Sequence, residues 1–363
     1  MDRYLGGQFP YAALFWPAFA AETASAMATH FLELSGGVGS DRAAQEPDGV
    51  TPSRIALDLR TVRLRDFTTA ESGVPALLCT PFSLHKASIA DLAGGHSLVA
   101  GLRAAGLERL FMTDWRSAGP DMAFLGIDQY LADLNVLVDS VGGRADLIGL
   151  CQGGWLSLIY AARFPDKVRK LVMAGAPIDI AAGQSRLSEI AVATPMIMFQ
   201  SLVSLGNGRV IGGSVARYWG NDTEPGNISA SLQTLAPLGS PEFSQLAAIF
   251  KDWNAWTIDL PGTYYLEVIE KLYKRNELAG GSFVALGQKI DLSHVNLPIY
   301  LLAGSADDVV APEQLLAVER LVATPPGHFC CEVAPCNHLA LFMGRQTLEE
   351  CWPKIVRWMR STE

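Results

Sequence analysis

The chain has 363 residues, of which 49% are hydrophobic and 18% charged, and its formal net charge is −9. A chain this long and this apolar can bury a large core, which excludes a mainly disordered protein. An acidic chain without a cluster of Lys and Arg argues against nucleic acid as the main partner, because phosphate binding needs concentrated positive charge.

The first 55 residues are expected to form an N-terminal helix, over residues 1–35, and a linker. The stretch 11–28 is apolar but contains Pro17 and Glu22, so it predicts an amphipathic helix rather than a membrane span. Residues 38–55 are rich in Gly, Asp and Pro, which is typical of a loop. The N-terminus shows no pattern of a secretory signal, and the expected location is the cytoplasm.

Strand and helix patterns then alternate along the chain. We expect strands at 75–79, 109–115, 145–150 and 170–174, and helices at 92–105, 127–142 and 154–164. Such alternation predicts an α/β fold with a mostly parallel sheet that is covered by helices on both faces. The core is expected to comprise residues 56–179 and 291–363.

The alternation lapses between residues 180 and 290, where mainly helical patterns predict a cap inserted into the core. It resumes with strands at 298–303 and 329–334 and a C-terminal helix at 348–359. Several aromatic residues of the cap are candidates for lining an acyl channel, although packing inside the cap explains them at least as well. They are Trp253, Trp256, Tyr264 and Tyr265.

The segment Gly149-Leu150-Cys151-Gln152-Gly153 stands between a predicted strand and a predicted helix. In a nucleophile elbow the reactive residue occupies the apex of a strained turn, and the residues two positions away must be small. Gly149 and Gly153 meet that demand. The helix dipole also favours a thiolate at Cys151. The pattern therefore predicts Cys151 as the nucleophile, with a small buried residue after a strand as the alternative.

A cysteine nucleophile needs a base and a group that orients the base. In α/β-hydrolases the chain order is nucleophile, acid, histidine. His338 follows the last predicted strand and is the expected base, whereas His294 and His328 are expected on the surface. Asp307 follows the strand at 298–303 and is the expected acid, with Asp308 beside it as the alternative. Either aspartate could also simply cap its loop.

An oxyanion hole usually consists of two backbone N–H groups. The N–H of Gln152, directly after the nucleophile, is one candidate. The second should come from the loop after the strand at 75–79, where Pro81 has no N–H, so Phe82 or Ser83 is expected. Candidate substrate contacts are Trp155, Ser83 and His85, although a solvated position in its loop would explain His85 equally well.

The six cysteines show no paired CxxC spacing of the zinc type and are too few for a disulfide scaffold in a chain of this length. Apart from Cys151, they are expected to be buried thiols in a reducing compartment. The chain has no Walker loop, and no glycine-rich dinucleotide fingerprint follows the first strand. Neither a metal nor a bound cofactor is therefore expected.

Several segments between residues 75 and 358 resemble those of polyhydroxyalkanoate synthases and of the intracellular depolymerases of the same polymer. The segments are Thr113-Asp114-Trp115, the residues 149–154, Trp253-Asn254 with the residues 259–262, the residues 276–281 with Asp291-Leu292, the residues 307–312, and Asn337-His338-Leu339. The resemblance implies an α/β-hydrolase fold and a catalytic triad that falls on Cys151, Asp307 and His338.

The resemblance also implies an acyl-enzyme thioester on Cys151. A synthase passes a 3-hydroxyacyl group from coenzyme A to the hydroxyl of a growing polyester, and a depolymerase passes the acyl group to water or a thiol. Coenzyme A would enter only as part of a substrate. Asn337 stands where synthases usually have Gly, and the residues 173–179 are more similar to the depolymerases. Synthesis and hydrolysis therefore both stay open at this point.

Three functions follow as hypotheses. The first is a synthase-like cysteine acyltransferase, and the second is a depolymerase or another ester or thioester hydrolase with the same triad. The third is a granule-surface binding protein with an inactive site, against which the complete set of triad residues argues. The partners that the resemblance suggests are a polymer granule surface and a homodimer or second subunit.

Overall fold

The computed structural model describes residues 46–214 and 240–361. The predicted N-terminal helix, most of the predicted linker and residues 215–239 of the predicted cap lie outside these ranges.

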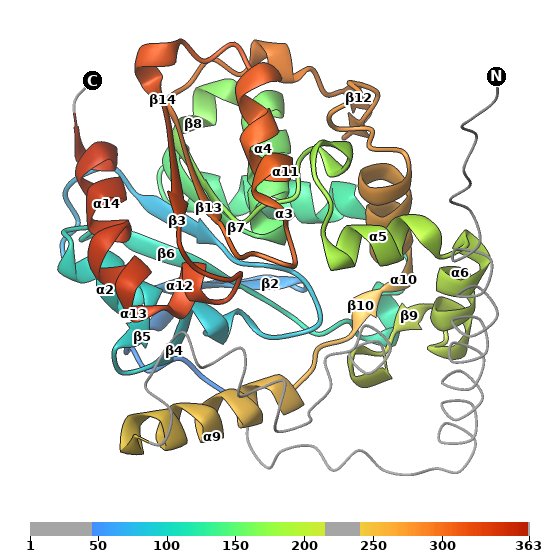
Figure 1. Ribbon diagram of the computed structural model, residues 1–363, viewed down its shortest axis with the longest axis horizontal. Helices are drawn as coiled ribbons and strands as arrows, with labels where there is room; N and C mark the ends of the chain where they lie inside the picture. The colour runs from blue at the N-terminus through green and yellow to red at the C-terminus, as the bar shows by residue number, and fades with distance from the viewer. Residues whose placement is uncertain (1–45, 215–239, 362–363) are drawn as a thin grey trace, which may run out of the picture.

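An eight-stranded sheet forms the centre of the described structure (Figure 1). Its strand order is β1-β2-β6-β3-β7-β8-β13-β14, and all pairs from β6 to β14 are parallel. The strands are β1 Arg54–Asp58, β2 Val62–Asp66, β3 Ala76–Cys79, β6 Leu110–Trp115, β7 Ala145–Leu150, β8 Val168–Ala174, β13 Ile299–Gly304 and β14 Phe329–Ala334. The predicted mostly parallel sheet is confirmed.

Helices cover both faces of this sheet (Figure 1). The strand β7 shows why two faces are needed, because its side chains alternate between two apolar clusters. Ala145 and Leu147 belong to the cluster with α3 and α4, and Ile148 and Leu150 belong to the cluster with α2 and α14. These helices are α2 Leu98–Ala104, α3 Ile127–Ser140, α4 Gln152–Arg163 and α14 Trp352–Arg360, joined by α11 Pro312–Leu316, α12 Ala340–Met343 and α13 Arg345–Glu350.

Three local predictions are wrong. The helix predicted at 92–105 begins only at Leu98, because Gly94 and Gly95 form the turn of a short hairpin of β4 Asp91–Ala93 and β5 His96–Ser97. The predicted C-terminal helix is two helices that meet at Cys351, since a proline follows in the first turn of α14. Arg54 and Ile55 belong to β1 and not to a linker, and β1 is largely exposed with its apolar residues in one run, so it lacks the alternating pattern of a strand.

The segment between 180 and 290 is mainly helical in its described part, as expected, while the limits of the cap stay a prediction. Its elements are α5 Arg186–Ala193, α6 Met196–Leu205, β9 Arg209–Val210, α9 Pro241–Ala255, β10 Leu260–Pro261, α10 Gly262–Glu267, a π-helix at Val268–Lys274, β11 Val284–Ala285 and β12 Gln288–Lys289. Among the described helices none is by itself long and apolar enough to cross a membrane; the bent pair α5 and α6 would pass by length and composition alone.

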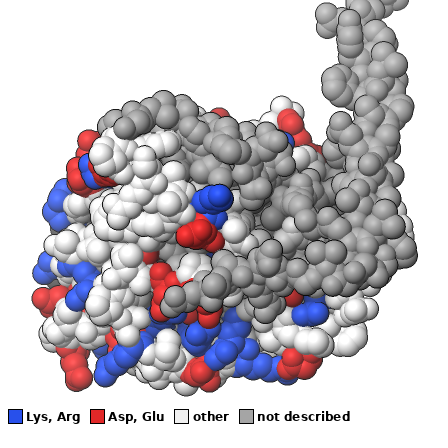
Figure 2. All heavy atoms as spheres, turned by 90° about the horizontal axis from the view of Figure 1, so that it is seen from below, with Lys and Arg blue, Asp and Glu red and all other residues white. Residues whose placement is uncertain are grey.

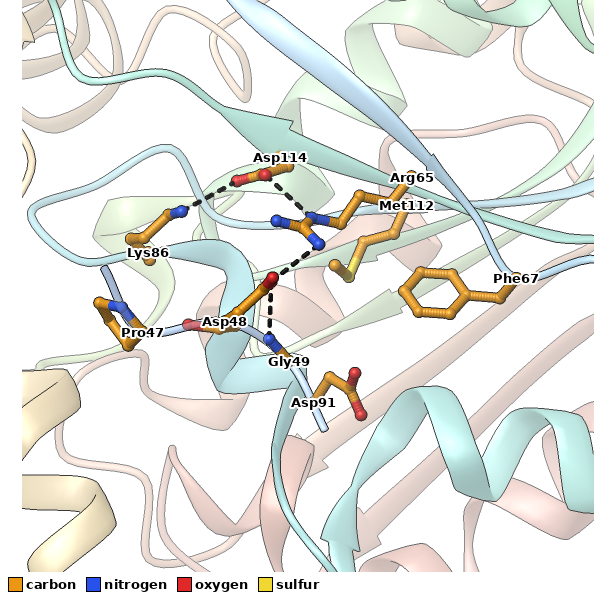
Figure 3. Close-up of a pocket in the computed structure, with 10 residues that line it drawn as sticks. Pro47, Asp48, Gly49, Arg65, Phe67, Lys86, Asp91, Met112 and Asp114 are labelled. Atoms are coloured by element: carbon orange, nitrogen blue, oxygen red, sulfur yellow. Dashed lines mark hydrogen bonds and ion pairs between the residues drawn. The ribbon is translucent and has the colours of Figure 1, made fainter. Parts of the chain in front are cut away.

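Charged side chains of both signs lie interspersed on the described part of the face in Figure 2. A separate group of charged side chains lies at the end of β6 around a cavity with room for about one water molecule (Figure 3). Asp114, which is 1% exposed, accepts a hydrogen bond from Arg65 Nε at 2.9 Å and lies 3.7 Å from Lys86 Nζ. Arg65 also pairs with Asp48 at 2.8 Å, and the Lys86 carbonyl accepts a hydrogen bond from Trp253 Nε1. Asp114 therefore ties the chain before β1 and the loop after β3 to the sheet.

Replacing Asp114 with Asn should lower the free energy of unfolding by about 3 kcal/mol, because Arg65 and Lys86 would lose their buried carboxylate and keep only the exposed ones of Asp48 and Glu46. The matched control is Asp139→Asn. Asp139 pairs with Lys167 but is half exposed, so its loss should be much smaller. Urea unfolding of both variants measures the difference. Equal losses would show that the Asp114 cluster contributes no more than a surface ion pair.

Candidate active site

Cys151 lies at the apex of a tight turn between β7 and α4. Its backbone has φ of 47° and ψ of −114°, a conformation that is costly for a residue with a side chain. The Cys151 N–H donates to the carbonyl of Ala174 at the end of β8, at 2.9 Å, and so anchors the turn to the sheet. The turn has the tight geometry that the glycine spacing predicts.

The two neighbouring glycines are required by close contacts. A Cβ on Gly153 would lie 2.0 Å from the carbonyl oxygen of Cys79, and a Cβ on Gly149 would lie 2.5 Å from the Cα of Gly154. Both distances are far below any real contact, and the obstructing atoms are backbone. The first turn of α4 therefore lies directly against the end of β3, and only glycine permits this approach.

His338 and Asp307 meet beside this turn. The Nδ1 of His338 lies 2.7 Å from Asp307 Oδ2, and the two residues are 7% and 8% exposed. The other carboxylate oxygen, Oδ1, accepts the N–H groups of Val309 and Val310 at 2.9 and 2.8 Å. Asp307 is thus fixed by its own loop on one side and orients the imidazole with the other. The alternative acid, Asp308, is exposed.

The imidazole of His338 also makes a hydrogen bond with Cys151. Burial alone would lower the pKa of His338, but the negative charges of Asp307 and Cys151 and the hydrogen bonds to both raise this pKa well above its ordinary value. The three side chains therefore form a continuous chain that favours the protonated form of the His338 imidazole. The structure brings together the three residues that the sequence predicts as a triad, and their catalytic role stays a proposal.

Two residues that sequence reasoning missed hold the imidazole in place. The ring of Phe342 meets the ring of His338 edge to face, with centroids 5.1 Å apart. Gly175 has φ of 55°, and a Cβ there would lie 3.1 Å from His338 Cε1. The Met173–Asp179 segment contains this glycine, but nothing in the sequence alone connects it to a histidine more than 160 positions later.

The two expected oxyanion donors, the N–H groups of Gln152 and Phe82, belong to segments that are in contact. The N–H of Gln152 begins α4, and the N–H of Phe82 lies in the loop after β3, against which α4 packs through Gly153. Within the described ranges neither N–H has a hydrogen-bond partner. The Phe82 ring is held by Tyr130 and Tyr264, with centroids 4.6 and 5.0 Å away. Their role in binding a substrate oxygen stays a prediction.

The structure corrects two expectations about substrate contacts. Trp155 is fully buried and donates a hydrogen bond from Nε1 to Gln152 Oε1 at 2.5 Å, so it supports Gln152 and offers no surface to a substrate. His85 is not a solvated loop residue, because its ring packs on Trp253 at 4.7 Å and its backbone pairs with Thr257. Ser83 is half-buried in the same loop.

Tyr264 and Tyr273 also lie near Cys151. Burial raises the pKa of the Tyr264 and Tyr273 hydroxyls, and the negative charge of Cys151 raises both further. Tyr264 was one of the expected aromatic candidates; Tyr273 was not, since a tyrosine in a helical stretch carries no signal of its distance from Cys151. Three of the four expected aromatics, Trp253, Tyr264 and Tyr265, are buried, which favours packing.

In the described part of the chain, no three His, Cys, Asp or Glu side chains form a group that could hold a metal ion. The cavity beside Asp114 is lined by none of the candidate site residues and is too small for a substrate.

Gly153→Ala should lower the free energy of unfolding by about 3 kcal/mol or more, because the added Cβ collides with the backbone carbonyls of Cys79 and Thr80. Gly94→Ala is the matched control, since a Cβ there meets nothing within 4 Å. Urea unfolding compares the two variants. A stable Gly153→Ala protein would contradict the close contact between α4 and β3.

Burial lowers the pKa of His85 from 6.5 to about 4. The unfolded chain therefore binds a proton at higher pH than the folded chain, and stability should be lost as the pH falls from about 6.5 to 4. The loss is at most about 3 kcal/mol. Free energies of unfolding measured across this pH range should fall in the parent protein. The His85→Phe variant lacks the imidazole and should lose less, so the difference in free energy between the two proteins should change with pH. A constant difference would contradict the burial of a neutral imidazole.

Comparison with known proteins supports the resemblance found in the sequence. A poly(3-hydroxyalkanoate) polymerase subunit of Synechocystis sp. is 27% identical over 338 residues, which cover 87% of this chain and 86% of that protein. A polymerase subunit of the same description from Allochromatium vinosum is 25% identical over 328 residues, covering 86% and 89%. The resemblance to polyhydroxyalkanoate synthases is confirmed over most of the chain.

Solved structures and a family model identify the fold. An epoxide hydrolase of Bacillus megaterium superposes with a TM-score of 0.52 at 15% identity, covering 84% of this chain and 99% of its own. A monoacylglycerol lipase of Paleococcus ferrophilus gives a TM-score of 0.51 at 16% identity, covering 82% and 98%. At such low identity these two show the fold alone. The family model described as alpha/beta hydrolase fold matches residues 109–344, and the chain belongs to this family.

Proposed function

We propose that the protein is a polyhydroxyalkanoate synthase-like cysteine acyltransferase. It would move 3-hydroxyacyl groups from coenzyme A to a polyester chain through a thioester on Cys151. The observation that carries the proposal is the buried chain from Asp307 through His338 to Cys151, in a protein similar over most of its length to polymerase subunits.

The first half of the reaction forms the acyl-enzyme. The Cys151 thiolate attacks the carbonyl carbon of the acyl-coenzyme A thioester, and the N–H groups of Gln152 and Phe82 bind the oxygen that becomes negative. The bond from the carbonyl carbon to the coenzyme A sulfur then breaks. His338 gives its proton to the departing sulfur, so free coenzyme A leaves and the acyl group stays on Cys151.

The second half transfers the acyl group to the polymer. Neutral His338 takes the proton of the hydroxyl at the end of the polyester, and that oxygen attacks the Cys151 thioester. The carbon–sulfur bond breaks, an ester forms, and the thiolate of Cys151 is restored next to protonated His338. Asp307 keeps the imidazole oriented in both halves and stabilises its charge.

Water would divert this second half toward hydrolysis, which is the alternative function. Cys151 is only 9% exposed, and Tyr264 and Tyr273 near it are 2% and 5% exposed. This enclosure supports transfer to an alcohol, because a synthase must keep water from the thioester. The depolymerase-like segment 173–179 ends in Asp179, whose carboxylate accepts a hydrogen bond from Asn276 at 2.7 Å, and so ties the cap segment to the core. The contact explains Asp179 by the packing of the cap segment on the core. It does not indicate whether an alcohol or water receives the acyl group.

The proposal extends to location and partners. We propose the cytoplasm, a polymer granule surface, and a homodimer or second subunit, because the relatives are described as polymerase subunits. Each of these stays a prediction.

The first test incubates the purified protein with 3-hydroxybutyryl-coenzyme A and quantifies free coenzyme A by chromatography. Chromatography is needed because Cys331 is an exposed free thiol that would react with thiol reagents. Cys151→Ala should reduce release by at least about 1,000-fold. The matched control, Cys331→Ala, should retain the parent rate.

The product separates the two functions. Insoluble polyester with coenzyme A release would establish a synthase, and soluble acid alone would establish a hydrolase. Release that survives in Cys151→Ala would contradict the nucleophile. No release from the parent protein would refute the synthase proposal for the isolated chain.

A further inference from the structure

The loop after β3 carries Phe82, whose N–H is one of the two proposed oxyanion donors. Before Phe82 this loop is fixed to the sheet. The N–H of Thr80 donates to Thr113 Oγ1 at 2.9 Å, and Thr80 Oγ1 donates to the Thr113 carbonyl at 2.7 Å. The carbonyl of Thr80 accepts a hydrogen bond from Trp115 Nε1 at 2.9 Å. These hydrogen bonds fix the chain two residues before the proposed donor.

The loop is fixed again two residues after Phe82, where the Leu84 carbonyl accepts the N–H of Ile258 at 2.8 Å. Between these two anchors, the backbone of residues 81–83 makes no hydrogen bond to any other described residue. Hydrogen bonds of the main chain therefore do not fix the N–H of Phe82 itself, and its position depends on the side chain.

The ring of Phe82 is held by three other buried aromatic rings. Phe82 is 3% exposed, and its ring centroid lies 4.6 Å from that of Tyr130, 5.0 Å from that of Tyr264 and 5.7 Å from that of Trp115. Tyr130 and Tyr264 also contact each other, with centroids 4.9 Å apart. Aromatic pairs at such distances are stabilised beyond the effect of burial alone. The aromatic cluster therefore fixes Phe82, and with it the N–H of the loop.

Tyr264 differs from the other two rings because it comes from α10 in the cap segment, whereas Tyr130 and Trp115 belong to α3 and β6. The N–H of Tyr264 donates to the Leu125 carbonyl at 3.0 Å. At the other end of α10, Glu267 accepts the N–H of Ile127 at 2.7 Å. These two hydrogen bonds hold α10 against the start of α3 and present the Tyr264 ring to Phe82.

We infer that Tyr264 is a positioning residue, whose ring holds Phe82 so that the Phe82 N–H meets the oxygen that becomes negative during acylation of Cys151. The inference rests on the proposed acyltransferase function and names a residue of the cap segment that this function needs. An oxyanion donor is effective when it is already in place where the charge develops. Displacing such a group by about 1 Å can lower the rate by a large factor.

The first measurement is the single-turnover rate of coenzyme A release from 3-hydroxybutyryl-coenzyme A, which reports acylation. Tyr264→Leu removes the ring but keeps an apolar side chain, and it should lower the rate constant at saturating substrate at least about 10-fold. The substrate concentration that gives half of this rate should stay within about 2-fold, because the donor acts on the transition state. Tyr264→Phe keeps the ring and should restore the parent rate.

The second measurement separates the oxyanion donor from the nucleophile. Iodoacetamide alkylates the Cys151 thiolate by displacing iodide from a saturated carbon, so no oxyanion forms. The alkylation rate of Cys151 in Tyr264→Leu should therefore stay within about 2-fold of the parent rate. Peptide mass spectrometry must identify the alkylated residue, since other thiols, such as the exposed Cys331, also react. A general disturbance of the triad would slow both acylation and alkylation.

Tyr265→Leu is the matched control. Tyr265 is the next residue of α10, it is 7% exposed, and its ring faces Phe199 of α6 with centroids 6.0 Å apart. The same change there should leave the acylation rate unchanged. Urea unfolding verifies that the variants fold. Where Tyr264→Leu does not fold, Phe82→Leu removes the same contact from the other side and keeps the N–H. It should show the same loss of acylation with unchanged alkylation.

The other outcomes overturn the inference. They are an unchanged acylation rate in Tyr264→Leu, an equal loss of acylation and alkylation, a loss that Tyr264→Phe shares, and a loss of the same size in Tyr265→Leu. In all of them the parent protein still releases coenzyme A, so the proposed function stands. No release from the parent protein refutes the proposed function, and the inference fails with it.

Discussion

The close contact between the first turn of α4 and the end of β3 is the constraint on which the site depends. No atom larger than hydrogen fits at Gly153 in front of the Cys79 carbonyl, so the helix and the strand approach as closely as two backbones can. That approach places the N–H of Gln152 beside the loop that carries Phe82. It also holds Cys151 in its unfavourable backbone conformation, because the residues on both sides are fixed by the sheet and the helix.

Two of the buried carboxylates, Asp114 and Asp307, differ in their partners. Asp114 faces the side chains of Arg65 and Lys86, and this cluster joins segments of the chain. Asp307 faces His338, whose imidazole can release its proton and take it back. The same kind of carboxylate thus joins chain segments at one place and, in the proposed function, orients an imidazole for proton transfer at the other.

Local patterns made much of this structure predictable. The strand β7, the Cys151 turn and α4 follow from an apolar run and two glycines within eleven residues, and the positions of Asp307 and His338 follow from the strands before them. The β1 strand escaped prediction because it is largely exposed and its apolar residues are consecutive, so it lacks the alternation that Val62 and Leu64 show in β2. Tyr273 and Trp155 show a second limit. Whether an aromatic side chain faces the nucleophile or the core depends on contacts between distant segments, which a single sequence does not contain.

The strain at residue 151 falls on the backbone and not on the sulfur. The close contacts at Gly149 and Gly153 and the hydrogen bond to Ala174 do not involve the Cys151 side chain. Serine differs from cysteine by one atom, so it would fit the same turn. A change of one nucleotide in the codon could therefore exchange the nucleophile while the scaffold stayed as it is. Evolution within this fold can pass between oxygen and sulfur chemistry without rebuilding the architecture that positions either atom.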